Sequence, residues 1–249
     1  MRISGFARVS ALALSIVVLP VLAGCGSNPF NPPIDPGGDG HIPGNAPLND
    51  TVENTMLRFE ATYEFQDLPK YENLLASDFR YTFSQASDPT LVQSYPNWGK
   101  DDEVATSQHL FEGFNSSTGP VPAASEIKMD LFGQQRTSDV EHLDSLAYYQ
   151  KVVVSRVVMS IEVPGTPEPT IYNIDARHEF YLVRGDAALL DASQEARTDR
   201  WYIRRWDDLS AAPSPTGGAI QIASVNSGVP GTFARVAESW GRLKGDYAR

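Results

Sequence analysis

The order of hydrophobic patterns along the chain is the feature that most restricts its fold. Residues 50–75 carry apolar side chains at helical spacing, whereas from residue 127 onward apolar and polar side chains alternate as they do in strands. Helices that precede a run of adjacent strands are typical of α+β domains. The sequence therefore predicts one domain over residues 50–210, with helices packed on one face of a curved antiparallel sheet.

Three helices are predicted in the first part of this domain. The first is expected to begin at a capping box of Asp50 and Glu53 and to end near Gln66. Asp67 is placed to cap a second, shorter helix. A third helix is expected over residues 101–111, with acidic side chains in its first turn.

Strands are predicted where apolar and polar side chains alternate. The first contains Phe79, Tyr81 and Phe83, and residues 84–100 are expected to form a loop after it. Further strands are expected around residues 127–131 and over residues 148–163, 170–183 and 201–206. In the second of these, alternation places four apolar residues on one face, namely Val153, Val157, Met159 and Ile161.

The end of the chain is expected to be a loose extension, residues 211–249. Its first part, residues 211–231, is polar and has no clear period. Four apolar residues then follow at helical spacing, so we expect a terminal amphipathic helix that docks back on the domain. These residues are Phe233, Val236, Trp240 and Leu243.

Residues 1–24 have the layout of a bacterial secretory signal. Arg2 and Arg8 supply positive charge, and the apolar run after them is too short to span a hydrocarbon core, which needs roughly 20 residues. The end of this segment resembles the lipobox that the lipoprotein signal peptidase recognises. The matching residues are Leu22, Ala23, Gly24 and Cys25. The resemblance implies that the chain is cut before Cys25 and that this residue is acylated.

Cys25 is the only cysteine of the chain, so no intramolecular disulfide can form. Behind it, six prolines and five glycines fall between Gly26 and Asn49, and such a segment cannot bury a core. We interpret residues 25–49 as a tether with a reach of roughly 25 to 30 Å. The sequence thus predicts a domain anchored to the lipid bilayer of a bacterial cell envelope. The anchor would lie in the outer membrane where the host has one, and otherwise on the outer face of the plasma membrane.

The charge of the chain argues against nucleic acid as a partner. Removal of residues 1–24 takes away two arginines, and the net charge falls from −11 to −13. A phosphate backbone repels such a surface, and no cluster of basic residues follows one element. The four histidines lack paired-ligand spacing, and no nucleophile elbow, phosphate-binding loop or calcium loop is found. We therefore expect no metal and no cofactor.

The order of elements and the stretch from Asp67 to Phe79 resemble the NTF2-like superfamily, which includes SnoaL-like and ketosteroid-isomerase-like proteins. The likeness covers roughly residues 50–210. Residues 201–209 and 239–244 further resemble a group of uncharacterised NTF2-like bacterial lipoproteins. The resemblance implies a cone, in which a curved sheet and its covering helices enclose a pocket. Because this cone serves isomerases, dehydratases, hydrolases and binding proteins, the fold leaves the activity open.

The resemblance also argues against ketosteroid isomerase chemistry. That mechanism needs an Asp base, and a Tyr and a protonated Asp as oxyanion donors. When Asp67 is aligned with the family's Asp after the first helix, Phe59 stands at the Tyr position and Phe83 at the base position. Phenylalanine neither accepts nor donates a proton. The third position falls near Asp175.

His178 is the best candidate for acid–base chemistry. Alternation places it on an apolar face of the strand over residues 170–183. A histidine there can act as an acid or a base near neutral pH, with Asp175 or Tyr63 as its partner. Histidines among apolar neighbours are more often core residues that bond to an adjacent element, and both interpretations stay open.

Six further residues are candidates for the walls of a pocket. Five offer aromatic surface, although aromatic residues at periodic positions are usually core. They are Phe59, Tyr63, Phe83, Trp98 and Trp201. The sixth, Arg205, shares a face with Trp201 in a regular strand. It either meets an anionic ligand in the pocket, or lies exposed or in an ion pair.

Three functions are compatible with these patterns. The leading hypothesis is a non-catalytic, lipid-anchored module that binds a small, apolar ligand or an envelope protein. The second is a SnoaL-like isomerase, dehydratase or hydrolase that acts on a small apolar substrate through His178 with Asp175 or Tyr63. The third is a purely structural envelope protein, which the lack of a cavity would favour. An oligomer is compatible with each of them.

Overall fold

The computed structural model describes residues 47–117, 119–145, 147–165, 169–186, 198–211 and 234–248. Side chains are not described for residue 144 or for residues 234–238. Several predicted features lie outside the described residues. They are the signal with Leu22, Ala23 and Gly24, the lipid acceptor Cys25, the tether up to residue 46, and the stretch 212–233. Within the described ranges, no helix combines the length and the apolar character needed to cross a membrane.

The described elements follow the predicted order of helices and then strands. The helices are α1 (Val52–Glu64), α2 (Leu68–Glu72), α3 (Pro89–Ser94), α4 (Lys100–Glu112) and α5 (Trp240–Tyr247), with a 3₁₀ helix, η1, at Val140–Ser145. The first strands are β1 (Leu75–Thr82), β2 (Trp98–Gly99), β3 (Phe114–Ser116) and β4 (Gly119–Val121). The long strands and the last ones are β5 (Glu126–Ser138), β6 (Tyr149–Val163), β7 (Thr170–Arg184), β8 (Trp201–Asp208) and β9 (Ala234–Glu238). The predicted loop over residues 84–100 therefore contains α3 and β2.

Side chains cap the first two helices. Thr51 is the N-cap of α1, because its hydroxyl accepts a hydrogen bond from the backbone N–H of Asn54 at 3.0 Å. Asp50 accepts from the Asn54 side chain instead, so the predicted capping box of Asp50 and Glu53 is wrong. Asp67 caps α2 as predicted, and it accepts from a backbone N–H at 3.1 Å.

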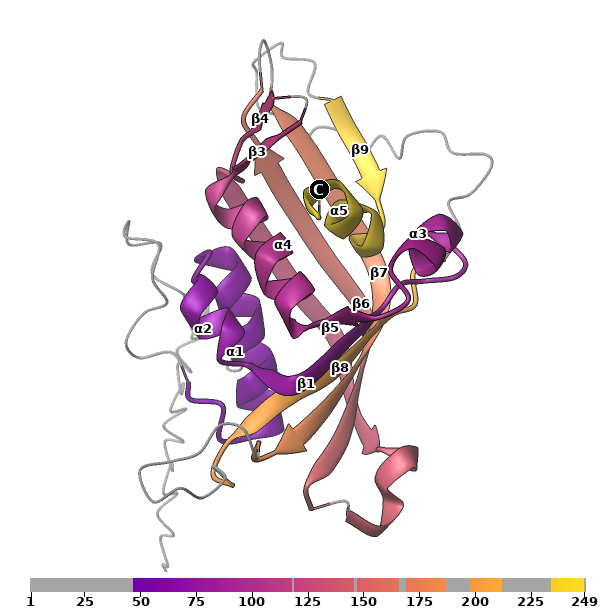
Figure 1. The fold of residues 1–249 in the computed structure, drawn as a ribbon. Helices are drawn as coiled ribbons and strands as arrows, with labels where there is room; N and C mark the ends of the chain where they lie inside the picture. Colours follow the sequence, from indigo (N-terminus) through magenta and orange to yellow (C-terminus); the bar gives the residue numbers. More distant parts are fainter. Residues whose placement is uncertain are drawn as a thin grey trace, which may run out of the picture. The chain divides into compact units, whose positions relative to one another are not determined.

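The large sheet has the strand order β2-β1-β8-β7-β6-β5, and β9 pairs with β7 beside this path. Most neighbours run antiparallel, as predicted, but β1 with β8 and β7 with β9 run parallel. Figure 1 shows that the sheet is strongly curved and that α4 and α5 lie over the same face of β5, β6 and β7. The α+β architecture with helices on one face of a curved sheet is thus the predicted one.

A β-bulge in β6 changes which residues of that strand face the interior. The register with β7 shifts by one residue between Val154 and Val157. Val152 and Val154 are consequently buried together with Val157. The inward position predicted for Val153 is wrong, because regular alternation does not continue through a bulge.

A second bulge, in β8, has the same effect on Arg205. Leu182 of β7 lies opposite Ile203, whereas the preceding Tyr181 lies opposite Arg205, so Arg204 is the extra residue. Ile203 and Trp206 are both completely buried. Arg205 therefore does not share the inward face with Trp201, as regular alternation predicts.

The end of the chain packs into the same core. Residues 234–238 form β9, so the predicted helix over Phe233 and Val236 is wrong there, and α5 begins only at Trp240. The hydroxyl of Ser239 caps α5 by accepting from the backbone N–H of Arg242 at 3.0 Å. Trp240, the first residue of α5, is 1% exposed. The predicted docking of a terminal helix is confirmed, and α5 packs against α4 and α3.

Candidate functional site

Aromatic side chains fill the side of the sheet that the helices cover. All five aromatic candidates from the sequence, which are Phe59, Tyr63, Phe83, Trp98 and Trp201, are at most 6% exposed. The Phe59 ring centroid lies 5.2 Å from those of Phe180 and Trp206, and both pairs are edge-on. Such contacts are typical of a close-packed aromatic core. Phe59 and Phe83 therefore hold packing positions.

A buried carboxylate lies among these rings. Glu103 on α4 is completely buried. Its Oε1 accepts a hydrogen bond from the Tyr71 hydroxyl at 2.5 Å, and its Oε2 accepts one from Trp98 Nε1 at 2.9 Å. The Tyr63 hydroxyl lies 3.4 Å from the same Oε1. Burial raises the pKa of both tyrosines well above the ordinary value, so their hydroxyls remain protonated donors.

Lys244 on α5 supplies the opposite charge. Its ammonium donates to Glu103 Oε1, and its side chain is 3% exposed. Nζ also lies 4.6 Å from the ring centroid of Trp206, 4.7 Å from that of Tyr81 and 5.8 Å from that of Trp240. Burial lowers the pKa of Lys244, and the Glu103 carboxylate opposes this effect. The carboxylate and the aromatic faces together replace the hydration that a buried ammonium loses.

His178 is buried in the same interior. Trp206 Nε1 donates to His178 Nδ1 at 3.1 Å, which assigns the ring proton to Nε2. Nε2 has no hydrogen-bond partner in the part of the chain that the structure describes. Burial lowers the pKa of His178 to about 4, although the Asp208 carboxylate lies 3.8 Å from Nδ1. The imidazole is therefore neutral at neutral pH.

Asp208 connects β8 to the beginning of α5. One of its carboxylate oxygens accepts from the Tyr81 hydroxyl and from the backbone N–H of Gly241, both at 3.1 Å. The other accepts from the backbone N–H of Ser210 at 2.8 Å. The bonds to Tyr81 and Gly241 hold the first turn of α5 against the sheet.

Two predicted site residues lie outside this interior. Asp175 is exposed and forms an ion pair with Arg156 at 2.7 Å, so the predicted pairing of His178 with Asp175 is not formed. The reason is geometric, because residues an odd number apart in a strand point to opposite faces. Arg205 pairs with Asp207 at 2.7 Å, and its guanidinium lies 4.5 Å from the ring centroid of Tyr181. The ion-pair alternative for Arg205 is therefore the one that the structure shows.

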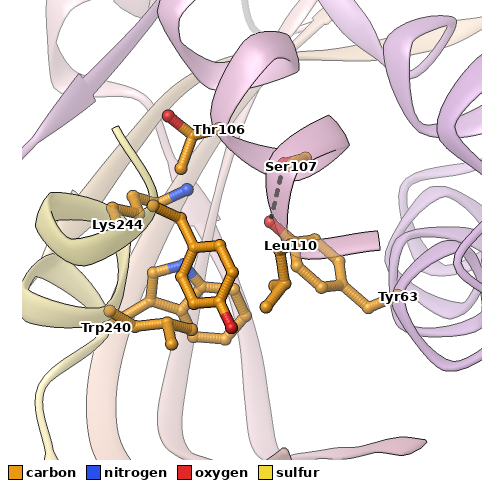
Figure 2. A pocket seen from close by; sticks show the side chains of 8 residues that line it. Tyr63, Thr106, Ser107, Leu110, Trp240 and Lys244 are labelled. Carbon is orange, nitrogen blue, oxygen red and sulfur yellow. Dashed lines mark hydrogen bonds between the residues drawn. The ribbon is translucent and has the colours of Figure 1, made fainter. Parts of the chain in front are cut away.

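The cavity that remains beside Lys244 is small. It measures about 10 Å³, which is room for about one water molecule. Figure 2 shows Lys244 and Trp240 of α5 on one side of it and Tyr63, hydrogen-bonded to Ser107, on the other. The remaining lining residues are Thr106, Leu110, Leu243 and Tyr247. Four of the lining residues, Trp240, Leu243, Lys244 and Tyr247, come from α5.

A larger hollow, about 680 Å³, is an open groove beside β1, β2 and the start of α4. Most of the side chains that line it are polar or charged. The charged ones are Asp78, Arg80, Lys100, Asp101, Asp102 and Arg205. This lining differs from the apolar pocket that the sequence led us to expect.

Among the described residues, Asp139, Glu141 and His142 bring potential metal-ligand atoms within 4.8 Å of one another. Each of them already has a partner. His142 Nδ1 lies 3.0 Å from the Asp139 carboxylate, and Glu141 pairs with Arg205 at 2.7 Å. These side chains thus already contact one another or Arg205, and we assign no metal to this cluster.

Sequence reasoning did not single out Glu103 or Lys244. Glu103 belongs to the acidic first turn of α4, a pattern that favours the helix N-terminus in any protein. A better signal lay at the end of the chain. Trp240, Leu243, Lys244 and Tyr247 follow the spacing of one helix face, which places a lysine on the apolar side.

No family model matches the sequence, and no curated protein matches it. Solved structures do resemble the fold. An NTF2-like protein of unknown function in nutrient uptake from Rhodospirillum rubrum is 14% identical, with a TM-score of 0.41 over 64% of this chain and 98% of its own. A putative scytalone dehydratase from Novosphingobium aromaticivorans is 11% identical, with a TM-score of 0.41 over 63% and 79%. A ketosteroid isomerase-like protein from Erwinia carotovora atroseptica is 11% identical, with a TM-score of 0.37 over 65% and 96%. These likenesses concern the fold alone.

Proposed function

We propose that the chain is a lipid-anchored protein of a bacterial envelope, held outside the cytoplasm through Cys25, and that its domain is a non-catalytic binding module. The anchor is supported by the layout of residues 1–24, by the lipobox-like run that ends at Cys25, and by the Pro- and Gly-rich segment behind it. Several acyl chains on one cysteine are sufficient for stable membrane attachment.

The binding role is supported by one observation: side chains of α5, Lys244 among them, fill the interior beside the buried carboxylate of Glu103. Lys244 places an ammonium between the Glu103 carboxylate and aromatic rings of the domain. The cavity left beside it has room for about one water molecule. We infer that α5 closes a binding site in the cone and that a ligand enters when α5 moves away.

The non-catalytic part of the proposal is supported by the state of the acid–base groups. The oxygens of Glu103 accept from Lys244, Tyr71 and Trp98, so the carboxylate is already fully engaged. His178 packs against the Trp206 ring. The acid next to it, Asp208, already accepts a hydrogen bond from Tyr81 and is therefore not free to exchange a proton with a substrate. General acid–base catalysis needs such a group within reach of a substrate proton.

Native-state hydrogen exchange of the soluble Cys25→Ser chain tests this closure. We expect the amides of α5 to exchange through an opening whose free energy lies below that of global unfolding, while α1, α4 and β7 exchange only with global unfolding. If α5 exchanges together with the sheet, the helix is part of the permanent core, and a purely structural envelope protein becomes the better interpretation.

A disulfide between α3 and α5 provides the matched control. A Cβ at position 245 would lie 3.6 Å from Leu91 Cγ, so Leu91→Cys with Gly245→Cys places two sulfurs in reach of each other. The oxidised variant should protect α5 as strongly as α4. Reduction of the same variant should restore its faster exchange.

A second candidate function, an enzyme of the SnoaL-like kind, is favoured by Nε2 of His178, which has no hydrogen-bond partner among the residues that the structure describes. In that case Asp208, not Asp175, is the acidic group next to the imidazole. Substrate turnover that is lost both in the oxidised disulfide variant and in His178→Gln would favour the enzyme. Binding without turnover would favour the module.

A further inference from the structure

The interior site has the chemistry of a cation site. We propose that it binds primary alkylammonium ions and that Lys244 is its occupant within the chain. This inference rests on the proposed closure by α5 and names the class of ligand that replaces the helix.

The first argument is the uncompensated charge of Glu103. Tyr71 and Trp98 donate hydrogen bonds to its carboxylate, but both are neutral donors. A buried carboxylate without a counter-charge is strongly unfavourable. A ligand that replaces Lys244 and buries the carboxylate again therefore has to supply a positive charge.

The second argument concerns the aromatic rings that remain around the site when α5 leaves. Trp240 lies on α5 and leaves with the helix, but Tyr81 of β1 and Trp206 of β8 stay. The centroids of these two rings lie 4.7 and 4.6 Å from the present ammonium nitrogen. Faces of Tyr and Trp at such distances attract organic cations. A carboxylate together with two such faces provides both charge and aromatic recognition.

The third argument concerns which cation fits. The contact of Lys244 Nζ with Glu103 Oε1 is a hydrogen bond, and a quaternary ammonium ion has no N–H to donate. A metal ion prefers several oxygen ligands in direct contact, whereas among the described residues the carboxylate that pairs with Lys244 is that of Glu103 alone. The occupant in place is an ammonium on an unbranched alkyl stem. A primary alkylammonium ion reproduces that group.

Chemical rescue of Lys244→Ala tests the inference. The substitution removes the side chain beyond Cβ, and n-propylammonium supplies the same atoms. We expect the melting temperature of the variant to rise by roughly 3 to 6 °C at a concentration tenfold above Kd, with no comparable rise in the wild type. Propan-1-ol and tetramethylammonium chloride at the same concentration and ionic strength should have no such effect.

The double variant Glu103→Gln with Lys244→Ala is the matched control, because it lacks the carboxylate that the cation is expected to need. Its melting temperature should not respond to n-propylammonium. An equal rise in the double variant, an equal rise with propan-1-ol, or no rise in Lys244→Ala would each overturn the inference.

If Lys244→Ala does not fold alone, recovery of folded protein from denaturant is measured with and without n-propylammonium. Recovery that depends on the amine supports the site, whereas recovery that is equal with propan-1-ol contradicts it. The result is separable from the test of closure. If Lys244→Ala responds to the amine but α5 exchanges together with the sheet, the ammonium site is supported and the proposed function is rejected. Fast exchange of α5 without any response to the amine would reject the ligand class alone.

Discussion

Lys244 and Glu103 lie 141 residues apart in the sequence and form an ion pair in the interior of the domain. Their side chains are 3% and 0% exposed. The pair joins the terminal helix α5 to α4 and places a cation and an anion in direct contact in the interior. The stability of the domain and the closure of the proposed interior site consequently depend on the same contact.

Removal of the ammonium should be costly. Lys244→Met keeps an unbranched apolar stem but leaves Glu103 buried without a counter-charge, and breaking such a pair costs about 3 to 5 kcal/mol. We expect a decrease of that size in the free energy of unfolding, measured by urea denaturation. The double variant Glu103→Gln with Lys244→Met is the control, and it should recover most of the loss. A cost below about 1 kcal/mol for Lys244→Met would show that Glu103 does not depend on Lys244.

Stability should fall as the pH rises, because of Glu60. Burial, together with the nearby Glu64 and Asp130 carboxylates, raises the pKa of Glu60 from 4.5 to about 8. Between these values the unfolded chain loses this proton and the folded chain keeps it. The contribution is thus fully present below pH 4.5 and is lost as the pH rises through about 8. We expect the free energy of unfolding to fall by about 2 to 4 kcal/mol from pH 5 to pH 8 on this account.

Glu60→Gln is the control for this pH dependence. His178 acts in the opposite direction, since its pKa is lowered from 6.5 to about 4 and its contribution is lost as the pH falls through that range. That effect is common to the wild type and to Glu60→Gln, so it cancels in the difference between their unfolding curves. Identical pH profiles for the two proteins would contradict the assignment to Glu60.

The anchor has a simple test. Cys25→Ser removes the sulfur to which we expect acyl chains to be attached, so the protein should move from the membrane fraction to the soluble fraction of the envelope. Fractionation followed by immunoblotting measures this change. A variant that still sediments with lipid would reject Cys25 as the anchor.

Much of the fold follows from local patterns. The helical spacing of α1, the cap at Asp67 and the alternation along β7 each predict their element, because each is determined by neighbours in the sequence. The errors lie where the pattern is interrupted. The bulges in β6 and β8 shift the side-chain alternation by one residue. A prediction from regular alternation therefore assigns Val153 and Arg205 to the wrong face of the sheet.

The site was harder to predict than the fold. Periodic positions predict that Tyr63 and His178 face the interior, and Trp98, from a predicted loop, is a candidate for the wall of a pocket; all three are buried. Their chemistry depends on Glu103, Lys244 and Trp206, which come from α4, α5 and β8. No local pattern links elements so far apart. A single sequence therefore predicts the walls of the site better than its charges.

The most direct test of the ammonium site closed by α5 is a crystal structure of Lys244→Ala grown with n-propylammonium. We expect the ammonium nitrogen at the present position of Lys244 Nζ, within hydrogen-bonding distance of Glu103 Oε1 and between the faces of Tyr81 and Trp206. A site that contains only water, or that has collapsed around Glu103 without the amine, would contradict the central claim.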